Sequence, residues 1–321
     1  MAGSFQVLLC YTLLKERKWA MKKIKEREPS TELKVLRLLN PIMKLSDYQH
    51  YLNLEKGYIG ELKLDEWLDG LLNNCLVVND LLLEHKGKIF QIDSLVIFQS
   101  IIYVFDSKYH EDDFYLDANK WKTLAGKEIT NPQPQMERAD SLLSQLLQQR
   151  LNVNIPIESF LVFTHPEFYL YNDPPTLPAI FPNQFHRFMK KMNSMTSKLN
   201  RSHESLAEQL VALHLNESPH TRLPEYDYEQ LKKGVVCGEC ASFMIERGRV
   251  WVCAGCGCKE YAQIAIIRSV EEFKLLFPDR KITSATIREW CAVKGDRKKI
   301  IRTLNNYFKR IGQGPASYYI D

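Results

Sequence analysis

The sequence lacks a long hydrophobic run, an internal repeat and a low-complexity segment, and its net charge is only +4. The apolar stretch Phe5–Leu14 is too short to span a bilayer, which takes roughly 20 residues. No basic residue precedes this stretch, so it also lacks the start of a signal peptide. We therefore expect no integral membrane segment, while the basic run Lys15–Arg27 leaves a membrane-surface role open. Met21 is a second candidate initiator, which leaves open whether residues 1–20 belong to the protein.

A disulfide framework is also absent, because the eight cysteines are clustered rather than spread. Five of them lie within 237–258, and four form two Cys-x-x-Cys pairs separated by a twelve-residue spacer. The spacer holds two strand-like runs joined at Arg247-Gly248, which is the layout of a zinc ribbon. We expect Cys237, Cys240, Cys253 and Cys256 to bind one structural zinc ion, with Cys258 as an alternative to Cys256. Clustered free thiols favour a reducing compartment, so the sequence predicts the cytoplasm.

Apolar and charged residues are present in ordinary proportion, at 45% and 26% of 321 residues, which is enough for two or three globular domains. We expect five segments: a basic helical extension over 1–50, a central domain over 51–216, a linker over 217–234, the zinc ribbon over 235–262 and a basic helical domain over 263–321.

Two apolar runs, Ile89–Phe98 and Ile101–Ser107, are rich in β-branched and aromatic residues and predict a β-hairpin. If the loop is Gln99-Ser100, outward counting pairs Asp93 with Asp106 and places Lys108 on the same face. Two facing carboxylates on a mostly apolar sheet repel one another and are costly to desolvate. A bound Mg²⁺ removes both costs, since this ion prefers a few carboxylate oxygens together with water.

Other segments predict the elements around this hairpin. We expect a short helix within Ser30–Leu45 that ends near Asn40-Pro41, and further helices over Gly57–Leu72, Asn131–Leu151 and, in two pieces, Gln184–Leu215. We expect strands over Cys75–Leu83 and Phe160–Thr164, and a loop over Tyr109–Thr130. Glu61 lies on the apolar stripe of its helix and points toward the sheet, or else complements the helix dipole in the first turn. Gln135 lies in the first turn of a helix capped by Asn131, where its amide reaches a metal-bound water or phosphate, or else is solvated.

In order along the chain, these residues resemble the nuclease-related domain (NERD) family of bacterial proteins, which has a metal-dependent PD-(D/E)xK nuclease core. The matching motifs are Gly60-Glu61, Gln91-Ile92-Asp93, Asp106-Ser107-Lys108, Trp121, and Asn131-Pro132 with Gln135. The resemblance covers residues 57–165. The chain departs from the family pattern at Asp106, where the family has Glu, and at Tyr109, where the family has Asn.

The resemblance implies an α/β (α+β) core with a mixed sheet flanked by helices, to which the small ribbon and the helical C-terminal domain are added. It implies a catalytic Mg²⁺ or Mn²⁺ held by Asp93, Asp106 and the carbonyl of Ser107. It also implies that Glu61 belongs to the active site and that Lys108 orients the attacking water or stabilises charge on the phosphate.

The C-terminal part of the chain is strongly basic. Residues 281–310 hold nine Lys or Arg against two acidic residues, a net +7, which leaves −3 for the rest. Expected helices over Ser269–Phe277 and Ser284–Ala292 precede a third, capped by Asp296 and running to Ile311. The last two resemble a helix-turn-helix, which predicts nucleic-acid binding through Arg297, Lys298, Lys299 and Arg302. A basic helical hairpin that only packs on the ribbon is the alternative.

Taken together, these features predict a divalent-metal-dependent nuclease that acts on DNA, with RNA as the less favoured substrate. The competing hypothesis is a non-catalytic nucleic-acid-binding protein with a degenerate nuclease fold. Every position of the family's active site that carries a charged residue also carries one in this sequence, which favours the enzyme. Asp106 in place of Glu and Tyr109 in place of Asn favour the competing hypothesis. The sequence leaves open the oligomeric state and the choice between endo- and exonuclease.

Overall fold

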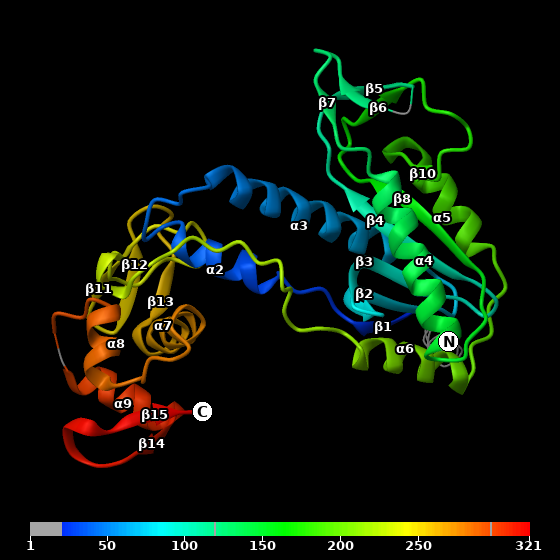
Figure 1. Cartoon of the computed structure of the whole chain (residues 1–321). Helices are drawn as coiled ribbons and strands as arrows, with labels where there is room; N and C mark the ends of the chain where they lie inside the picture. Colours follow the sequence, from blue (N-terminus) through cyan, green and yellow to red (C-terminus); the bar gives the residue numbers. More distant parts are fainter. Residues whose placement is uncertain (1–20, 119, 296) are drawn as a thin grey trace, which may run out of the picture. The chain divides into compact units, whose positions relative to one another are not determined.

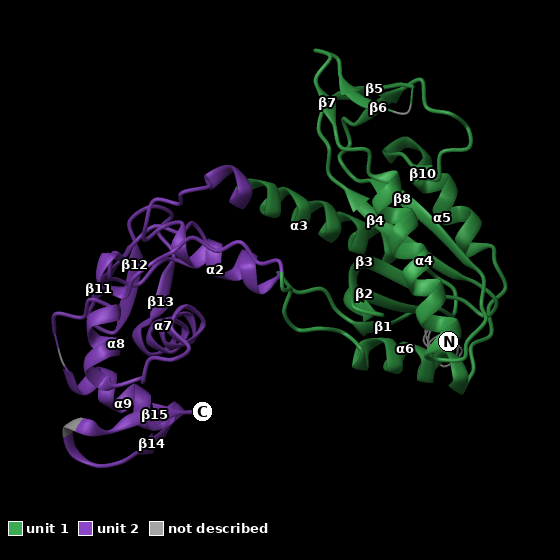
Figure 2. Cartoon of the chain, in the orientation of Figure 1, with its two compact units in different colours: residues 1–29, 52–219 green, residues 30–51, 220–321 purple. Residues whose placement is uncertain are grey.

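The computed structural model describes residues 21–118, 120–295 and 297–321 (Figure 1). These residues form two compact units, coloured separately in Figure 2. The first unit holds residues up to Pro29 and Leu52–Pro219, and the second holds Ser30–Tyr51 and His220–Asp321. Helix α3 (Tyr48–Leu68) therefore begins in the second unit and continues in the first.

A six-stranded mixed sheet forms the centre of the first unit, in the order β1-β2-β3-β4-β8-β10. β2, β3 and β4 are antiparallel neighbours, while β1 pairs parallel with β2 and β8 pairs parallel with both β4 and β10. The strands are β1 (Lys22–Lys25), β2 (Leu76–His85), β3 (Lys88–Ile97), β4 (Ile102–Lys108), β8 (Ile157–Phe163) and β10 (Ala179–Ile180). The predicted hairpin is the β3–β4 pair at the middle of this sheet.

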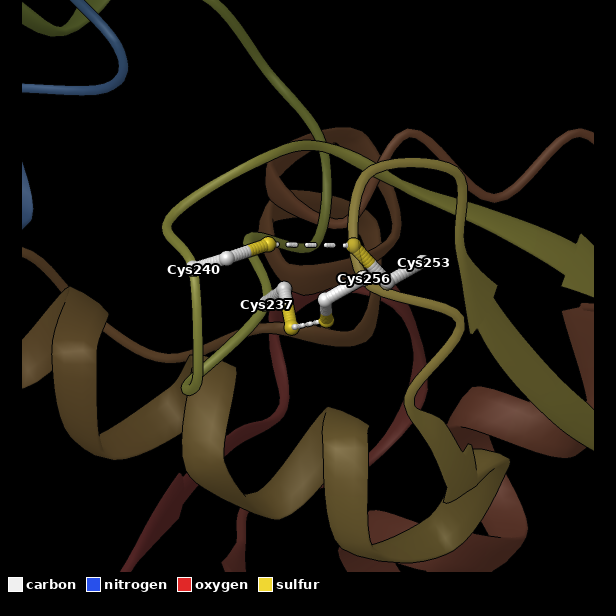
Figure 3. Close-up of side chains that lie close together, drawn as sticks. All are labelled: Cys237, Cys240, Cys253 and Cys256. Atoms are coloured by element: carbon white, nitrogen blue, oxygen red, sulfur yellow. Dashed lines mark hydrogen bonds between the residues drawn. The ribbon is translucent and has the colours of Figure 1, made fainter.

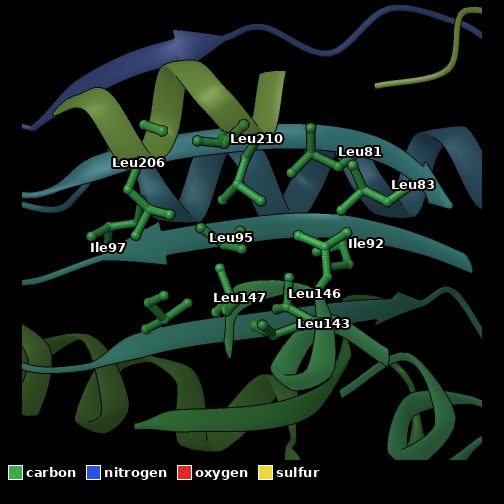
Figure 4. Close-up of a cluster of buried hydrophobic side chains, with 14 of the residues drawn as sticks. Leu81, Leu83, Ile92, Leu95, Ile97, Leu143, Leu146, Leu147, Leu206 and Leu210 are labelled. Atoms are coloured by element: carbon green, nitrogen blue, oxygen red, sulfur yellow. The ribbon is translucent and has the colours of Figure 1, made fainter. Parts of the chain in front are cut away.

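Helices cover both faces of the sheet, because successive side chains of its strands point to opposite sides. Ile102 and Val104 of β4 pack with α4 (Gln133–Gln149) and α6 (Arg201–Ala212) in one apolar cluster. Figure 4 shows this cluster, with leucines of α4 and α6 labelled beside residues of β2 and β3. Tyr103 and Phe105 pack with α3 and α5 (Phe185–Asn193) in another. The predicted mixed sheet flanked by helices is confirmed.

Three strands of a second, four-stranded sheet lie in Tyr109–Thr130, the segment for which we expected a loop, so that prediction is wrong. Its order is β7-β6-β5-β9, with β5 (Asp113–Asp117), β6 (Lys120–Thr123), β7 (Glu128–Ile129) and β9 (Tyr169–Tyr171). The strands are short and three of them contain charged residues, so the sequence shows no clear alternation of apolar and polar residues. They are held by Phe114 and Trp121, which are buried against Phe163 of β8 and Met136 of α4.

Several helix bounds differ from those expected. α3 begins nine residues before Gly57, so Glu61 lies in the middle of the helix and its alternative role in the first turn is wrong. α4 begins at Gln133, with the Asn131 side chain accepting from the Gln133 N–H. The last helix ends at Tyr307 rather than Ile311, because Lys309–Ile311 forms a strand with Tyr318–Ile320. Its expected cap, Asp296, lies outside the described residues.

The second unit combines a three-stranded ribbon with helices. Its elements are α2 (Thr31–Leu39), β11 (Met244–Arg247), β12 (Val250–Cys253), β13 (Lys259–Tyr261), α7 (Ala262–Leu276), α8 (Ser284–Trp290), α9 (Arg297–Tyr307), β14 (Lys309–Ile311) and β15 (Tyr318–Ile320). Short 3-10 turns lie at Pro182–Gln184 in the first unit and at Tyr228–Gln230 and Gly314–Ala316 in the second. An aromatic cluster lies among the helices of this unit and consists of the rings of Tyr228, Phe273, Phe277 and Trp290.

The two units divide the segment 1–50, for which we expected a single helical extension. Residues 30–51 belong to the second unit, since α2 packs on α7, whereas Lys22–Lys25 add a strand to the sheet of the first unit. Within the described part of the chain, no helix is long and apolar enough to cross a membrane. The expectations for Phe5–Leu14 and residues 1–20 lie outside the described residues.

Candidate functional site

The register of the β3–β4 hairpin is the one that the sequence predicts. Ile97 pairs with Ile102 and Ser94 pairs with Phe105, while the Phe98 N–H donates to the Ile101 carbonyl at the turn. Continued by one residue, this register brings Asp93 opposite Asp106. The regular pairing ends there, and the Asp93 carboxylate instead accepts the Ser107 backbone N–H, with 2.7 Å between Oδ2 and N.

A pocket of about 180 Å³ opens at this end of the hairpin. All five residues predicted to be catalytic line it: Glu61 from α3, Asp93 from β3, Asp106 and Lys108 from β4, and Gln135 from the first turn of α4. Ser107, predicted as a metal ligand, lines it as well. The structure thus brings together, in one cavity, side chains that come from four elements.

The carboxylates of this pocket are held in unfavourable surroundings. Burial raises the pKa of Asp93 well above its usual value, and the negative charges of Glu61 and Asp106 raise it further. Burial also raises the pKa of Glu61, although Arg27 acts in the opposite direction. Asp106 is neutralised by Lys108, with 2.5 Å between Oδ1 and Nζ. The pocket therefore favours either a proton or a cation beside Asp93.

Arg27 is a buried cation beneath the pocket, and sequence reasoning did not identify it. Its side chain is only 1% exposed and forms a two-point ion pair with Asp65, at 2.8 Å from Nε to Oδ2 and 3.0 Å from Nη2 to Oδ1. Nη1 donates to Glu61 Oε2 at 2.8 Å, and Nη2 donates to the Asp93 carbonyl at 2.7 Å and to Ser94 Oγ at 2.9 Å. Arg27 thus fixes the helix that carries Glu61 against the strand that carries Asp93.

Counting these groups shows what the pocket is able to hold. Four carboxylates, those of Glu61, Asp65, Asp93 and Asp106, meet the two cations Arg27 and Lys108, so the group carries excess negative charge. Magnesium and manganese ions prefer oxygen ligands and are bound by one or two carboxylates together with water. The donor set at the pocket fits such an ion.

Comparison with protein families agrees with this geometry. The family model described as the nuclease-related domain (NERD) matches residues 56–164, which include every residue of the pocket. Residues 56–164 form a nuclease-related domain. No curated protein and no solved structure gives a significant match to the chain.

Gly60 explains one motif of the nuclease-related domain in steric terms. A Cβ at this position would lie 2.7 Å from Tyr109 Cβ, 3.1 Å from Thr164 Oγ1 and 3.3 Å from Ser107 Oγ. Only glycine lets α3 approach the ends of β4 and β8 this closely, and this approach sets the depth of Glu61. Tyr109 fills this contact and packs against the ring of His165.

The residues that sequence reasoning missed had a weak signal. Asp65 lies four residues after Glu61 and therefore shares its face of α3, so the sequence does indicate two inward carboxylates that need a cation. Arg27 belongs to the basic run Lys15–Arg27, for which the sequence left a membrane-surface role open. Only the parallel pairing of β1 with β2 carries Arg27 into the domain.

The four predicted cysteines converge in the second unit (Figure 3), and their sulfur atoms all lie within 4.8 Å of one another. The Cys237 and Cys256 sulfurs are 3.7 Å apart, and the Cys240 and Cys253 sulfurs 3.3 Å. Tetrahedral zinc with bonds of about 2.3 Å places its sulfur ligands about 3.8 Å apart. The cluster is therefore compatible with a zinc ribbon. Cys256, and not the alternative Cys258, completes it.

The thiols of this cluster differ in acidity. Hydrogen bonds from the side chain and backbone of Ser242 lower the pKa of Cys240 to about 6. The pKa of Cys256 is raised to about 12. The hydrogen bond from the Cys258 backbone N–H acts to lower this pKa, but hydrogen bonds with the other three thiols of the cluster, together with burial, raise it by more. Metal binding to the cluster must therefore displace at least one proton.

The basic residues of α9 do not share one environment. Arg297, Lys298 and Arg302 are exposed. Lys299 instead binds the ribbon, with its Nζ 2.5 Å from Glu246 Oε1 and 2.6 Å from the Gly248 carbonyl. Of the four residues predicted to bind nucleic acid, Lys299 is thus already occupied by a contact within its own unit.

The close approach at Gly60 yields a paired test. Gly60→Ala should lower the free energy of unfolding by about 1–3 kcal/mol, because the added methyl group has no space against Tyr109. Gly57→Ala, in the same helix, should raise it by about 0.5–1 kcal/mol, since a Cβ there meets nothing within 4 Å and alanine favours the helix. Urea unfolding of the two variants and the wild type measures both effects. Equal destabilisation by both substitutions would contradict the steric account.

Proposed function

We propose that this protein is a divalent-metal-dependent nuclease that hydrolyses phosphodiester bonds in DNA. The observation that carries the proposal is the convergence of Glu61, Asp93, Asp106, Lys108 and Gln135 on one pocket inside the nuclease-related domain. The raised pKa of Asp93 supports it, because burial and the neighbouring carboxylates make its ionised form costly, and a bound metal ion would offset that cost.

Each side chain has a role that follows from its position. Asp93 and Asp106, with the Ser107 carbonyl, would hold Mg²⁺ or Mn²⁺, which when bound polarises the phosphate and lowers the pKa of water. Lys108 is placed to stabilise negative charge that develops on the phosphate, once a metal replaces it as the partner of Asp106. Glu61, held by Arg27, is placed to accept a hydrogen bond from a bound water. The Gln135 amide at the rim is placed to donate to a phosphate oxygen.

The competing function is nucleic-acid binding without cleavage. Asp106 supports it, because its carboxylate reaches one methylene less far than the glutamate of the family. Tyr109 is a weaker argument, since the packing of its Cβ against Gly60 gives this residue a structural role. A cleavage assay separates the two functions.

Cleavage should depend on Asp93. Asp93→Ala should reduce hydrolysis of circular and linear DNA, in the presence of Mg²⁺ or Mn²⁺, by at least about a hundredfold, because it removes a metal ligand. Asp117→Ala is the matched control, since Asp117 is an exposed carboxylate on β5 outside the pocket. Gel analysis of nicked and linear products provides the measurement. If the wild-type protein cleaves neither DNA nor RNA with either metal, the nuclease proposal fails and nucleic-acid binding without cleavage becomes the favoured function.

We further propose that the four-cysteine cluster holds one structural zinc ion. A closed set of four thiolates leaves no position for a substrate, so the metal would stabilise the ribbon rather than catalyse a reaction. The described cysteines are free thiols, which fits a reducing compartment, and we propose the cytoplasm.

Cys256 and Cys258 provide an internal test of the zinc site. Cys256→Ser should lose the metal, whereas Cys258→Ser should retain about one zinc ion per chain, because only Cys256 lies in the cluster. Elemental analysis of freshly purified, reduced protein measures the content. Zinc should be released as the pH falls, since protons compete for the thiolates. Absence of zinc from the wild-type protein would refute the site.

We also propose that α9 contributes to duplex DNA binding. Its exposed residues Arg297, Lys298 and Arg302 are placed on the helix that the helix-turn-helix resemblance assigns to the major groove. Lys299 would act indirectly, by fixing α9 to the ribbon through Glu246.

Salt dependence tests this helix. A plot of the logarithm of duplex affinity against the logarithm of salt concentration has a negative slope, to which each phosphate contact contributes about −0.9. Replacing Arg297, Lys298 and Arg302 with alanine should make this slope less negative by about two to three. The charge-matched control replaces Arg187, Lys190 and Lys191, which are exposed on α5 of the other unit. Fluorescence anisotropy at several salt concentrations gives the slopes. Equal slopes for wild type and the α9 variant would mean that α9 does not contact phosphate.

A further inference from the structure

The ribbon sheet has two chemically different faces, which its register defines. Glu246, Trp251 and Glu260 are cross-strand neighbours on one face. On that face Trp251 is buried, and both carboxylates are neutralised: Glu246 by Lys299 of α9 and Glu260 by Arg268 of α7. This face is thus the side on which the ribbon packs against the helices of its own unit.

The opposite face, here termed the outer ribbon face, carries two rows of three residues. One row is Ile245–Val252–Lys259 and the other is Arg247–Val250–Tyr261, each with one residue from each strand. None of the six is buried; Tyr261 is 67% exposed and Ile245 is 49% exposed. An apolar centre is therefore open to solvent, with an aromatic ring and two cations around it.

The charge on this face is of one sign. Both acidic residues of the ribbon strands point to the other face, where Lys299 and Arg268 engage them. Arg247 and Lys259 form no ion pair within the described part of the chain. The outer ribbon face is therefore complementary to a polyanion.

We propose that the outer ribbon face binds single-stranded nucleic acid. Tyr261 stacks on an unpaired base, Val250 and Val252 provide the apolar floor beside it, and Arg247 and Lys259 contact the phosphates. This is the combination of an aromatic platform and basic flanks by which single strands are held without sequence preference. The site lies in the second unit and is separate from the catalytic pocket, so it does not depend on the proposed hydrolysis.

Geometry favours a single strand over a duplex. Bases of a duplex are stacked on one another and present no free ring surface to Tyr261, whereas unpaired bases do. DNA and RNA single strands share the chemistry that this face recognises.

The test measures binding of fluorescein-labelled dT₁₂ and U₁₂ oligonucleotides to the full chain. The Asp93→Ala background, without added divalent metal, prevents cleavage of the probe. Tyr261→Ala should weaken binding about tenfold, because one stacked base is lost, while Tyr261→Phe should bind like the parent. Tyr48→Ala is the matched control, since Tyr48 belongs to the same unit and is 51% exposed on a helix. Tyr261 caps α7 only through its backbone, so its side chain supports no helix cap.

A second arm tests the two cations. Replacing Arg247 and Lys259 with alanine should make the log–log slope of dT₁₂ affinity against salt concentration less negative by about 1.4, because each phosphate contact on a single strand contributes about −0.7. Lys86→Ala with Lys88→Ala changes the net charge equally in the other unit and should leave the slope unchanged. Unchanged dT₁₂ and U₁₂ affinity in Tyr261→Ala would overturn the proposal, as would equal dependence of duplex binding on Tyr261. Unequal affinity for dT₁₂ and U₁₂, with Tyr261 required for both, would also support the site, because the two probes differ both in the sugar and in the methyl group of the base.

Discussion

The candidate site depends on one buried guanidinium. Arg27 joins three elements, because it comes from the segment after β1, pairs with Asp65 and Glu61 of α3, and donates to the backbone of β3 at Asp93. Removing one partner of such a buried pair leaves an uncompensated charge, which typically costs about 3–5 kcal/mol. The same contacts that hold the domain together therefore also fix two carboxylates of the pocket. Crowding at Asp93 is tolerated because Arg27 and Lys108 offset part of the negative charge.

Local patterns are sufficient to predict the centre of the nuclease-related domain. The register of the hairpin follows from its loop length and its apolar alternation, and these two features alone place Asp93 opposite Asp106. Residues that depend on distant partners are not predictable in this way. Arg27 is 38 residues from Asp65 in the chain, and its burial results from strand pairing rather than from composition. Likewise, the small sheet around Phe114 and Trp121 consists of strands too short and too charged to show a period, and the rings of other elements supply its core.

The second unit shows why net charge is a limited guide to binding. The basic segment predicted nucleic-acid binding through four residues of one helix, yet one of them, Lys299, holds the ribbon within the unit. Arg268 of α7, outside the basic segment, also pairs with a carboxylate of the ribbon. These two contacts turn the acidic residues of the ribbon inward. The charge available to a partner is therefore decided by which groups are left after such internal pairing, and this depends on the register of three short strands.

The two units are interlaced in sequence, since each is made of two separate segments. Strand β1 must join a sheet whose other strands are synthesised after residues 30–51, and α2, which ends at Leu39, must wait for α7, which begins only at Ala262. Formation of the second unit thus requires the C-terminal part of the chain, so folding during synthesis should finish late. A fragment that starts in the linker near residue 220 would also lack α2 and expose the surface of α7 that α2 covers. Cutting the chain at the apparent linker would therefore divide a packed unit rather than separate two domains.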